Sequence, residues 1–582
     1  MRFTPKQLFF PVLLFITIAV QAQERSDTEM LSIAKDKLTN TAFAKTTKKN
    51  VSHSTELRIV ANDSQYCMYA DNHGHGYVIV ARNKAFSPVI GYGEEPFQDE
   101  ISCCMRSCLD MINANLEARL ENNEVQEATG KDGATYEIVE PLLKTFWGQR
   151  SPYNLLCPKD GNGNTTYSGC VATAMAMVLN YFRYPSSVQG EGFYTLKTNE
   201  KDTIRVSIQS TYDWDNMLNT YTSSSGTANQ RNAVAQLMYD CGCAVGMNYG
   251  STGSGASVTT AARKFNEVFG YAAVNHTNKN YYSDYEWRQL VYDQLKAGCP
   301  LMHSGTDTNT NSGHAFVFDG VDADGLVHVN WGWGSSNHGY FDILALTPTN
   351  GSTKHNFSSG LGFIYNLKPK PQLEEGEEQE YQLVVGRGTG SYKNDYYTIS
   401  IKDNRVILNT YGVFNWTPVP FKGYVGTRYE SLDGGSNYNV RLKTPTGGYY
   451  VPLDVASRAS KSYGGYDANH DQTPSSIKPG RYKLFFAAYN DDKNNLKYRS
   501  PIRQKGEGHI YWILTVADDG TLSLSDKIIV DGPEDIIPSG IKMITSKGEN
   551  KHIHEIYNLN GQRVDSNYRG IVIINGKKII KK

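Results

Sequence analysis

Three residues of this 582-residue chain have the types and the order that covalent acyl transfer needs. Gln149 stands in "FWGQRSPYN", Cys170 in "YSGCVAT" and His314 in "NSGHAFVF". A thiol becomes a strong nucleophile when a histidine takes its proton, and a nearby amide can hold the oxyanion that forms. We therefore take Cys170 as the candidate nucleophile, His314, 144 residues downstream (314 − 170 = 144), as its base, and Gln149 as the oxyanion donor.

The segment after Cys170 predicts a helix that begins at the thiol. Apolar residues recur there at helical spacing, and Tyr184-Pro185 ends the pattern. These residues are Val171, Ala174, Met175, Val178, Leu179 and Phe182. A helix N-terminus lowers the pKa of a thiol, and Gly169 leaves the first turn open to a substrate backbone. The alternative is an inert buried thiol, which this stretch alone does not exclude.

His314 begins a predicted strand that turns near Asp322 and returns to Trp331. His314 and Asn330 are each eight residues from Asp322 (322 − 314 = 8; 330 − 322 = 8), so a turn centred there sets them opposite each other. If the centre of the turn shifts by one residue, the residue opposite His314 changes by two positions along the returning strand. The register of the hairpin is therefore left open. Because side chains alternate faces, we expect Asn330 to hold the imidazole and Trp331 or Trp333 to shield it from water.

The first residues of the chain predict export. Arg2 and Lys6 precede an apolar run at residues 8–20, and Ala22 ends the small-residue segment that is typical of a secretory signal. The run is too short for a comfortable membrane span, and we expect no transmembrane segment later in the chain. The nine cysteines are an odd number for an oxidising compartment, so at least one thiol stays free or pairs between chains. We expect a secreted or cell-surface protein, with the periplasm as an alternative.

Composition and charge patterns divide the chain into six predicted parts. A polar hinge at residues 123–136 separates a small front unit from the segment that holds the three candidate residues. "KPKPQLEEGEEQE" predicts an exposed linker, and the short strands and Gly/Asn/Asp turns after it predict β-sandwich modules. The predicted parts are a signal peptide at 1–22, an α+β front unit at 23–130, the candidate-site segment at 131–367, a linker at 368–380, one or two β-sandwich modules at 381–540, and a C-terminal β tail, a possible sorting signal, at 541–582.

Six ordered blocks resemble the streptopain family of papain-fold cysteine peptidases, in the form found among Bacteroidetes. They are "WGQRSPYN", "GCVATAMAMVLNYFRYP", "YDWDNM", "NYGSTGSGAS", "GHAFVFDGVDADGLVHVNWGWG" and "GYFDI". The resemblance covers roughly residues 57–367, and "GYVIVARNKAFSPVIGYGEE" in the front unit is similar to the inhibitory propeptide of that family. The order Cys, His, Asn and the 144-residue separation also agree with the ~130–150 residues of papain-like proteases, although the local papain signature around the nucleophile is absent.

This resemblance implies an α+β, papain-like two-subdomain catalytic domain and an endopeptidase made as a self-processing zymogen. It implies Cys170 as nucleophile, His314 as base and Gln149 at the oxyanion hole. A preference for a bulky apolar P2 residue follows from the same resemblance, as do Gly313 and Ser254 as residues lining the substrate cleft. The partners would be protein or peptide substrates, together with the chain's own propeptide as an intramolecular inhibitor that covers the site and is cut off at the hinge.

Several function classes are disfavoured by the sequence. A net charge of −1 gives no general attraction to nucleic acid. The cysteines lack the accompanying His or Cys pairs of a metal site, and "GSTGSGAS" lacks the lysine of a phosphate-binding loop. We therefore expect neither a metal nor a cofactor. Two alternatives stay open: a cysteine-dependent amidase or transpeptidase with the same thiol and histidine, and a surface adhesin whose catalytic region has decayed.

Overall fold

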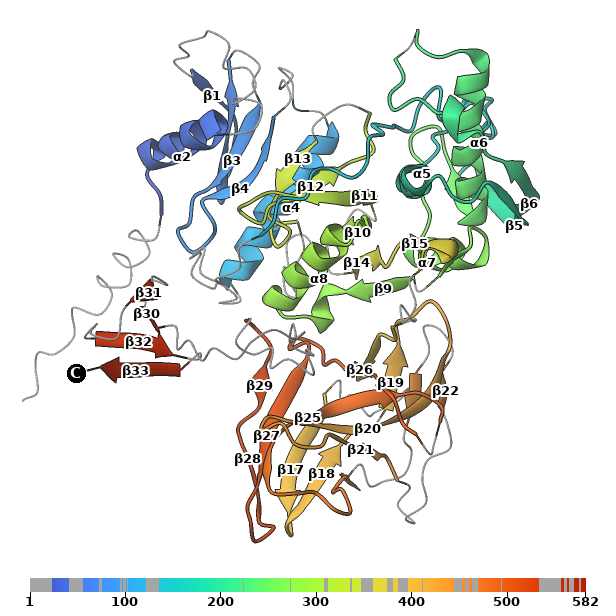
Figure 1. Cartoon of the computed structure of the whole chain (residues 1–582). Helices are drawn as coiled ribbons and strands as arrows, with labels where there is room; N and C mark the ends of the chain where they lie inside the picture. The colour runs from blue at the N-terminus through green and yellow to red at the C-terminus, as the bar shows by residue number, and fades with distance from the viewer. Residues whose placement is uncertain are drawn as a thin grey trace, which may run out of the picture. The chain divides into compact units, whose positions relative to one another are not determined.

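A computed structural model of the chain, drawn in Figure 1, describes most of the sequence. The described residues are 24–40, 56–72, 76–94, 97, 101, 103–121, 136–222, 224–272, 274–307, 312–334, 338–346, 359–373, 380–385, 396–410, 412–443, 453–455, 460–462, 469–492, 495–532, 556–558, 563–564, 570–574 and 577–581. The predicted signal peptide and all of the predicted hinge except Tyr136 lie outside them. Within the described residues, no helix has both the length and the apolar character that a membrane span requires.

The chain divides into two compact units, Met1–Ile536 and Ile537–Lys582. The second unit contains a four-stranded antiparallel sheet with the order β31-β30-β32-β33. Its strands are β30 (Ile556–Asn558), β31 (Arg563–Val564), β32 (Gly570–Ile574) and β33 (Lys577–Lys581). They fall within the segment for which a β tail is predicted.

One antiparallel sheet of ten strands runs through the front unit and the candidate-site segment, in the order β1-β2-β3-β4-β13-β12-β11-β10-β14-β9 (Figure 1). The front unit supplies β1 (Leu57–Asn62), β2 (Tyr66–Asp71), β3 (Tyr77–Ala81) and β4 (Val89–Gly93). The segment after it supplies β9 (Asn275–Asn278), β10 (Leu301–Asp307), β11 (Ser312–Val321), β12 (Val327–Asn330), β13 (Gly339–Phe341) and β14 (Ser359–Tyr365). The β3 sequence YVIVA is buried throughout, as expected of a central strand rich in β-branched residues.

Among the described residues, six helices and several short elements complete this part of the fold, which is α+β as predicted. The helices are α2 (Asp27–Asn40), α4 (Cys103–Glu121), α5 (Cys170–Phe182), α6 (Ala228–Ala244), α7 (Val258–Glu267) and α8 (Asp284–Lys296). The short elements are β5 (Ser187–Leu196), β6 (Asn199–Thr211), η1 (Trp214–Asn216), β7 (Met247–Tyr249), β8 (Tyr271–Ala272), η2 (Lys279–Tyr281), β15 (Lys368–Pro369) and η3 (Lys370–Gln372). Helix α2 was not predicted, and the predicted linker begins with β15, which pairs with β8.

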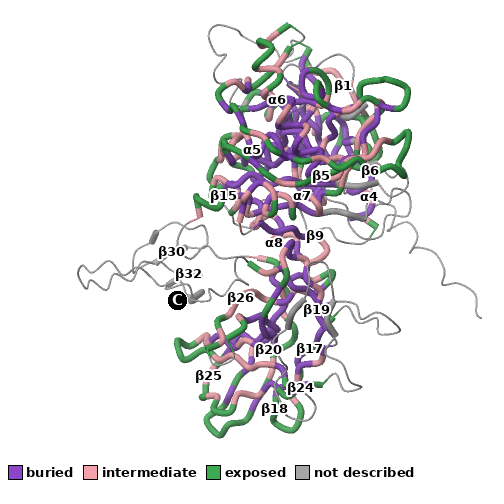
Figure 2. The backbone as a smooth tube through the Cα atoms, turned by 90° about the vertical axis from the view of Figure 1, so that its right-hand side faces the viewer, coloured by how far each residue is buried: buried purple, intermediate pink, exposed green. Residues whose placement is uncertain are grey.

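Two hydrophobic cores meet at strand β11. Ala315 and Val317 belong to the core that surrounds α5, whereas Phe316 and Phe318 belong to the core that includes the inner residues of the front unit. Alternate residues of one strand point to opposite faces, which explains this division. Figure 2 shows the buried tube of α5 within the first of these cores.

The front unit joins the candidate-site segment within the ten-stranded sheet, where β4 lies next to β13. Strand β4 pairs with β13, with Tyr92 opposite Tyr340 and Gly91 opposite Phe341. The approach is close, because a Cβ on Gly339 would lie 2.3 Å from the backbone oxygen of Tyr92. The Nδ2 of Asn115 on α4 donates a hydrogen bond of 2.8 Å to the Ala345 carbonyl oxygen. The strands of the front unit are therefore part of the same sheet as those of the candidate-site segment in the full chain.

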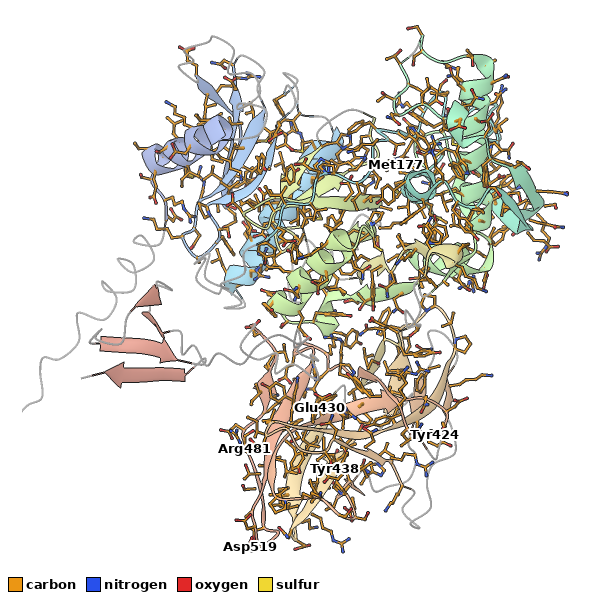
Figure 3. The ribbon with its side chains drawn as sticks, in the orientation of Figure 1. Met177, Tyr424, Glu430, Tyr438, Arg481 and Asp519 are labelled. Atoms are coloured by element: carbon orange, nitrogen blue, oxygen red, sulfur yellow. The ribbon has the colours of Figure 1, made fainter. Side chains whose placement is uncertain are left out.

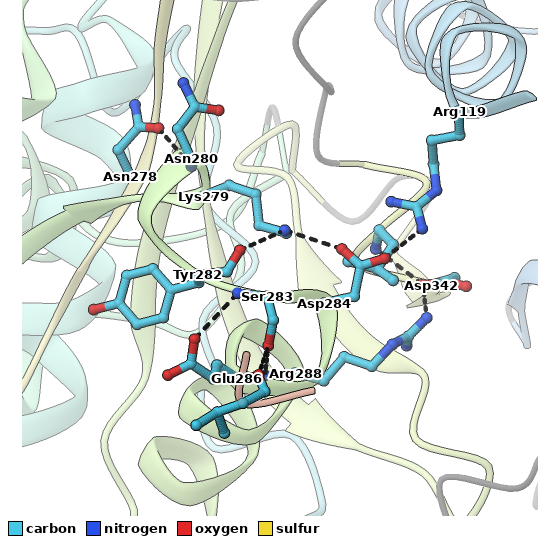
Figure 4. Close-up of polar contacts among 12 residues, drawn as sticks. Arg119, Asn278, Lys279, Asn280, Tyr282, Ser283, Asp284, Glu286, Arg288 and Asp342 are labelled. Carbon is cyan, nitrogen blue, oxygen red and sulfur yellow. Dashed lines mark hydrogen bonds and ion pairs between the residues drawn. The ribbon is translucent and has the colours of Figure 1, made fainter. Parts of the chain in front are cut away.

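A buried ion pair reinforces this junction (Figure 4). Arg119 on α4 contacts Asp284 at the start of α8 at 2.5 Å, and Lys279 contacts the other carboxylate oxygen at 2.9 Å. Burial alone would raise the pKa of Asp284, but these two cations hold the pKa well below its usual range. The ion pair is therefore complete at neutral pH, and its stabilisation is lost progressively as the pH falls below the unfolded pKa of ~3.9 toward the lower folded pKa of Asp284.

The described residues between 381 and 530 form an all-β region whose sheets share one hydrophobic core. Its strands are β16 (Leu383–Val385), β17 (Thr398–Lys402), β18 (Arg405–Asn409), β19 (Gly412–Asn415), β20 (Phe421–Ser431), β21 (Tyr438–Arg441), β22 (Leu453–Val455), β23 (Ser460–Ser462), β24 (Asn469–Asp471), β25 (Gly480–Tyr489), β26 (Tyr498–Pro501), β27 (Ile510–Val516), β28 (Leu522–Leu524) and β29 (Ile528–Ile529). Arg503 of this region reaches Glu286 of α8 at 2.7 Å and lies 4.0 Å from the centre of the Tyr282 ring. Glu286, which belongs to the capping box of α8, therefore also holds the β region through Arg503.

We expect Asp284→Asn to weaken the attachment of the front unit. The substitution removes the negative charge that both Arg119, whose side chain is 7% exposed, and Lys279 contact, which should lower the free energy of unfolding by about 1–3 kcal/mol. Denaturant unfolding at pH 7 measures the effect in a Cys170→Ala background. Asp215→Asn is the matched control, because its partner Arg183 lies 2.7 Å away in an exposed pair. Equal stability of the two variants would contradict the assignment.

Candidate active site

Cys170 is the first residue of α5, where the sequence placed it. Gly169 precedes it with φ +88°, and a Cβ at that position would lie 2.7 Å from the sulfur of Met247. Only glycine therefore fits this turn without displacing its neighbours. Thr173 closes the first helical turn, because its backbone N–H and its hydroxyl each donate to the Gly169 carbonyl oxygen at 3.0 Å.

The Cys170 thiol lies beside the backbone N–H of Ala315 on β11, the strand that carries His314. Burial raises the pKa of this thiol, while the backbone N–H groups of Ala315 and Val171 oppose the rise by favouring the thiolate. Among the seven cysteines whose side chains the structure describes, Cys170 is the one that is not fully buried, and all seven are free thiols. Cys170 is thus the accessible thiol of this part of the chain.

The imidazole of His314 is held by a backbone carbonyl. Its Nε2 lies 2.8 Å from the carbonyl oxygen of Trp331. A carbonyl oxygen can only accept, so Nε2 carries the hydrogen and Nδ1 of the neutral ring keeps a free lone pair. Burial lowers the pKa of His314 to about 4, and the hydrogen bond to Trp331 opposes this shift in part. The ring is therefore neutral at pH 7 and has its basic nitrogen available.

The prediction that Asn330 holds the imidazole is wrong. Its Nδ2 donates to the Thr145 carbonyl oxygen at 2.9 Å, and its Oδ1 accepts from the Gly332 N–H at 3.2 Å. Asn330 pairs with Val317 rather than with His314, because Val321 pairs with Val327 and the hairpin is therefore centred on Asp324 and not on Asp322. A bulge between Phe318 and Gly320 changes the register by one residue only. The side chain of Asn330 instead fixes the backbone turn that presents the Trp331 carbonyl.

Two tryptophans stack beside His314, as the prediction of a shielding aromatic required. The Trp333 ring lies 4.9 Å from the imidazole with an interplanar angle of 27°, and Trp331 stacks on Trp333 at 5.1 Å. Trp331 is fully buried, whereas Trp333 packs at the margin of the same core. Trp333 is therefore the ring that shields the imidazole, and Trp331 contributes its carbonyl oxygen. The carbonyl was missed because backbone acceptors leave no mark on the residue types.

Gln149 lies next to the start of α5. Its backbone carbonyl oxygen accepts a hydrogen bond of 3.1 Å from the N–H of Ser168, two residues before Cys170. Its side chain is half-buried. Segments 147–149 and 168–170 are thus tied together, as the predicted oxyanion site requires.

The two predicted cleft residues differ in their surroundings. Gly313 is exposed and immediately precedes His314 on β11. The hydroxyl of Ser254 donates to the Tyr167 carbonyl oxygen at 2.7 Å and accepts from the Gly250 N–H at 3.0 Å. Ser254 therefore stabilises the loop that packs beside Gly169. Gly313 has no side chain and is exposed to solvent next to His314. Contact of either residue with a substrate stays a prediction.

The described residues contain no group of three or more His, Cys, Asp or Glu side chains that could bind a metal ion. His303 and His328, which the sequence places near the site, do not enter it. His303 is fully buried and stacks on Phe316 at 4.8 Å, and His328 contacts Asp319 at 2.6 Å. The arrangement suited to chemistry is thus a thiol, a neutral imidazole and a nearby amide.

Comparisons with known proteins place this chain beside cysteine peptidases. The model of the "Peptidase C10 family" matches residues 147–341. The chain is 30% identical over 325 residues to streptopain of Streptococcus pyogenes serotype M28, covering 50% of this chain and 78% of that protein. It is 26% identical over 362 residues to the thiol protease/hemagglutinin PrtT of Porphyromonas gingivalis, covering 56% of this chain and 40% of that protein.

Two solved structures from Prevotella intermedia are also similar. A fragment of prointerpain A is 33% identical with a TM-score of 0.49, covering 55% of this chain and 100% of that chain. Active wild-type interpain A is 37% identical with a TM-score of 0.35, covering 39% of this chain and 94% of that chain.

In the full-length chain, we expect the pH midpoint for alkylation of Cys170 by iodoacetamide to lie above that of the unfolded chain. Burial raises the pKa of this thiol above its usual range, and only the thiolate reacts. Mass spectrometry of the uncut chain, followed by peptide mapping, measures the rate at each pH. The urea-unfolded chain is the control and should give a midpoint near ~8.5. A midpoint below 7 in the folded chain would contradict the assigned environment.

Proposed function

The chain belongs to the peptidase C10 family and is a cysteine peptidase, and on this premise we propose that Cys170 is its nucleophile and His314 its general base. The proposal also covers export, synthesis as a self-processing zymogen and endopeptidase action on proteins. The observation that carries the assignment is the hydrogen bond from His314 Nε2 to the Trp331 carbonyl oxygen. This bond fixes the tautomer whose Nδ1 can accept the proton of a thiol.

The proposed reaction proceeds through an acyl-enzyme. Nδ1 of His314 accepts the thiol proton as the sulfur of Cys170 bonds to the substrate carbonyl carbon, and the carbonyl oxygen becomes an oxyanion. The N–H of Cys170 and the amide of Gln149 stabilise this charge. The imidazolium then gives its proton to the leaving amine as the C–N bond breaks. In the second half, His314 takes a proton from water as the water oxygen bonds to the thioester carbon. The C–S bond then breaks, which releases the carboxylic acid product, and the proton passes from His314 to the Cys170 thiolate.

The zymogen proposal is supported by the way the front unit is built into the sheet. Its β4 pairs with β13, and its core residues share one cluster with Phe316 and Trp331. In the full chain the pKa of the Cys170 thiol is raised and that of His314 is lowered, and both shifts favour the neutral pair, which is consistent with a form of low reactivity. We propose that the cut falls at residues 123–136 and that the removed front unit is the inhibitor.

The proposed substrates are protein chains with a bulky apolar residue at P2, a preference that the family membership supports. Gly313 leaves room for an extended substrate backbone beside His314. A series of peptides that differ only at P2 tests the preference through kcat/KM. Export is supported by the charged, apolar and small-residue order of residues 1–22.

We expect Cys170→Ala to abolish peptide hydrolysis and to persist at full length after removal of the signal peptide. Loss of the sulfur removes the covalent step, while the fold keeps its other contacts. Gel analysis over time measures the shortening, and mass analysis of a digested denatured protein measures new termini. Wild type should shorten and gain activity, and added active enzyme should cut the variant. Equal shortening of the purified variant would show that the cut is not autocatalytic.

We expect Gln149→Ala to lower kcat by about 10²–10³-fold with little change in KM, because its amide would act mainly on the transition state. Steady-state kinetics on a short peptide measures both constants after the front unit has been removed. Arg150→Ala is the neighbouring control, because its side chain is exposed. A change in KM alone would assign Gln149 to ground-state binding instead.

A further inference from the structure

We propose that His338 is a positioning residue that ties the loop of Trp333 to the segment of Gln149 and so holds both sides of the active site in register. This inference rests on the proposed roles of Gln149 and His314 and adds a residue that contacts neither the thiol nor the substrate. His338 lies directly before β13, and its side chain is 4% exposed.

The ring of His338 forms a hydrogen bond to a backbone carbonyl of the segment 330–334. Its Nε2 lies 2.6 Å from the carbonyl oxygen of Gly334, so Nε2 carries the hydrogen and donates. Burial lowers the pKa of His338 to about 4, and the bond to Gly334 opposes this shift in part. The ring is therefore neutral at pH 7, and it also packs against Phe146 at 5.0 Å.

Gly334, which His338 holds, is in turn hydrogen-bonded to the segment that leads into Gln149. Its N–H donates to the Trp147 carbonyl oxygen at 3.0 Å, and a Cβ on Gly148 would lie 3.3 Å from the Gly334 nitrogen. The indole N–H of Trp147 donates in turn to the Leu218 carbonyl oxygen at 2.8 Å. The backbone that leads into Gln149 is thus fixed on one side by Trp147 and on the other by Ser168.

The same turn sets the position of the base. Gly334 follows Trp333, whose ring stacks on His314. At the other end of the turn, Asn330 holds the N–H of Gly332. A Cβ on Gly332 would lie 3.3 Å from Thr173 and 3.7 Å from Met177, which Figure 3 labels on α5. Asn330 and His338 therefore clamp the two ends of residues 330–334 between helix α5 and the segment of Gln149.

The chemistry needs this clamp because two groups from distant parts of the chain must act on one carbonyl. A displacement of about 1 Å between such groups can cost about 10²-fold in rate. Loss of the hydrogen bond from His338 releases the Gly334 carbonyl. Gly334 can then move, which weakens the hydrogen bond from its N–H to the Trp147 carbonyl oxygen. We expect kcat to fall about 10- to 100-fold, with KM nearly unchanged.

The test compares His338→Phe with His338→Gln in the processed enzyme. Phenylalanine keeps the ring but cannot donate, whereas the glutamine amide can donate to Gly334. His303→Phe is the matched control, because His303 is also buried against Phe316 and, among the residues that the structure describes, neither of its ring nitrogens has a hydrogen-bond partner. His338→Phe should lose kcat, His338→Gln should recover much of it, and His303→Phe should resemble wild type.

A double variant separates positioning from general instability. If His338 acts through the Gln149 segment, His338→Phe should reduce kcat less in a Gln149→Ala background than in wild type. Fully multiplicative effects, or an unchanged kcat in His338→Phe, would overturn the inference. If His338→Phe does not accumulate as folded protein, His338→Leu, which also cannot donate, decides the comparison. Cys170→Ala is assayed in parallel. Activity in that variant would contradict the proposed function. An inactive Cys170→Ala together with a wild-type kcat in His338→Phe would contradict this inference alone.

Discussion

The hydrogen bond between His314 Nε2 and the Trp331 carbonyl oxygen is the constraint on which the rest of the site depends. A side-chain partner could rotate, but a backbone carbonyl is fixed by the chain on either side of it. Trp331 is fully buried, and Asn330 before it is bound to Thr145. The direction of the imidazole is thus determined by sheet register and core packing.

The sequence predicted the elements whose signals are local and missed those that depend on register. The apolar spacing after Cys170 repeats within one helix, so the position of the thiol could be predicted. The partner of His314 depended on where a hairpin turns and on a bulge between Phe318 and Gly320. That bulge and the carbonyl of Trp331 are properties of backbone geometry, which residue types report only weakly. Asn330 was therefore recognised as part of the site but given the wrong contact.

The two hydrophobic cores explain how a single strand can serve both the chemistry and its control. One face of β11 packs on the helix of Cys170, and the other packs on the core shared with the front unit. Any rearrangement of the front unit changes the burial of Phe316, whose ring lies 5.8 Å from His314 and 4.7 Å from Trp331. On the proposed zymogen mechanism, the front unit can thus affect the base through the core even without contacting the substrate.

Burial gives this site its geometry and also limits its reactivity. The packing that orients His314 lowers its pKa to about 4, and the packing around Cys170 raises the pKa of the thiol. Both shifts favour the neutral pair, so formation of a thiolate and an imidazolium in this environment is costly. On the proposed zymogen mechanism, removal of the front unit exposes to water part of the core that it shares with Phe316 and Trp331. Greater exposure to water lowers the cost of a charged imidazolium beside this core, so loss of burial favours activation on that mechanism.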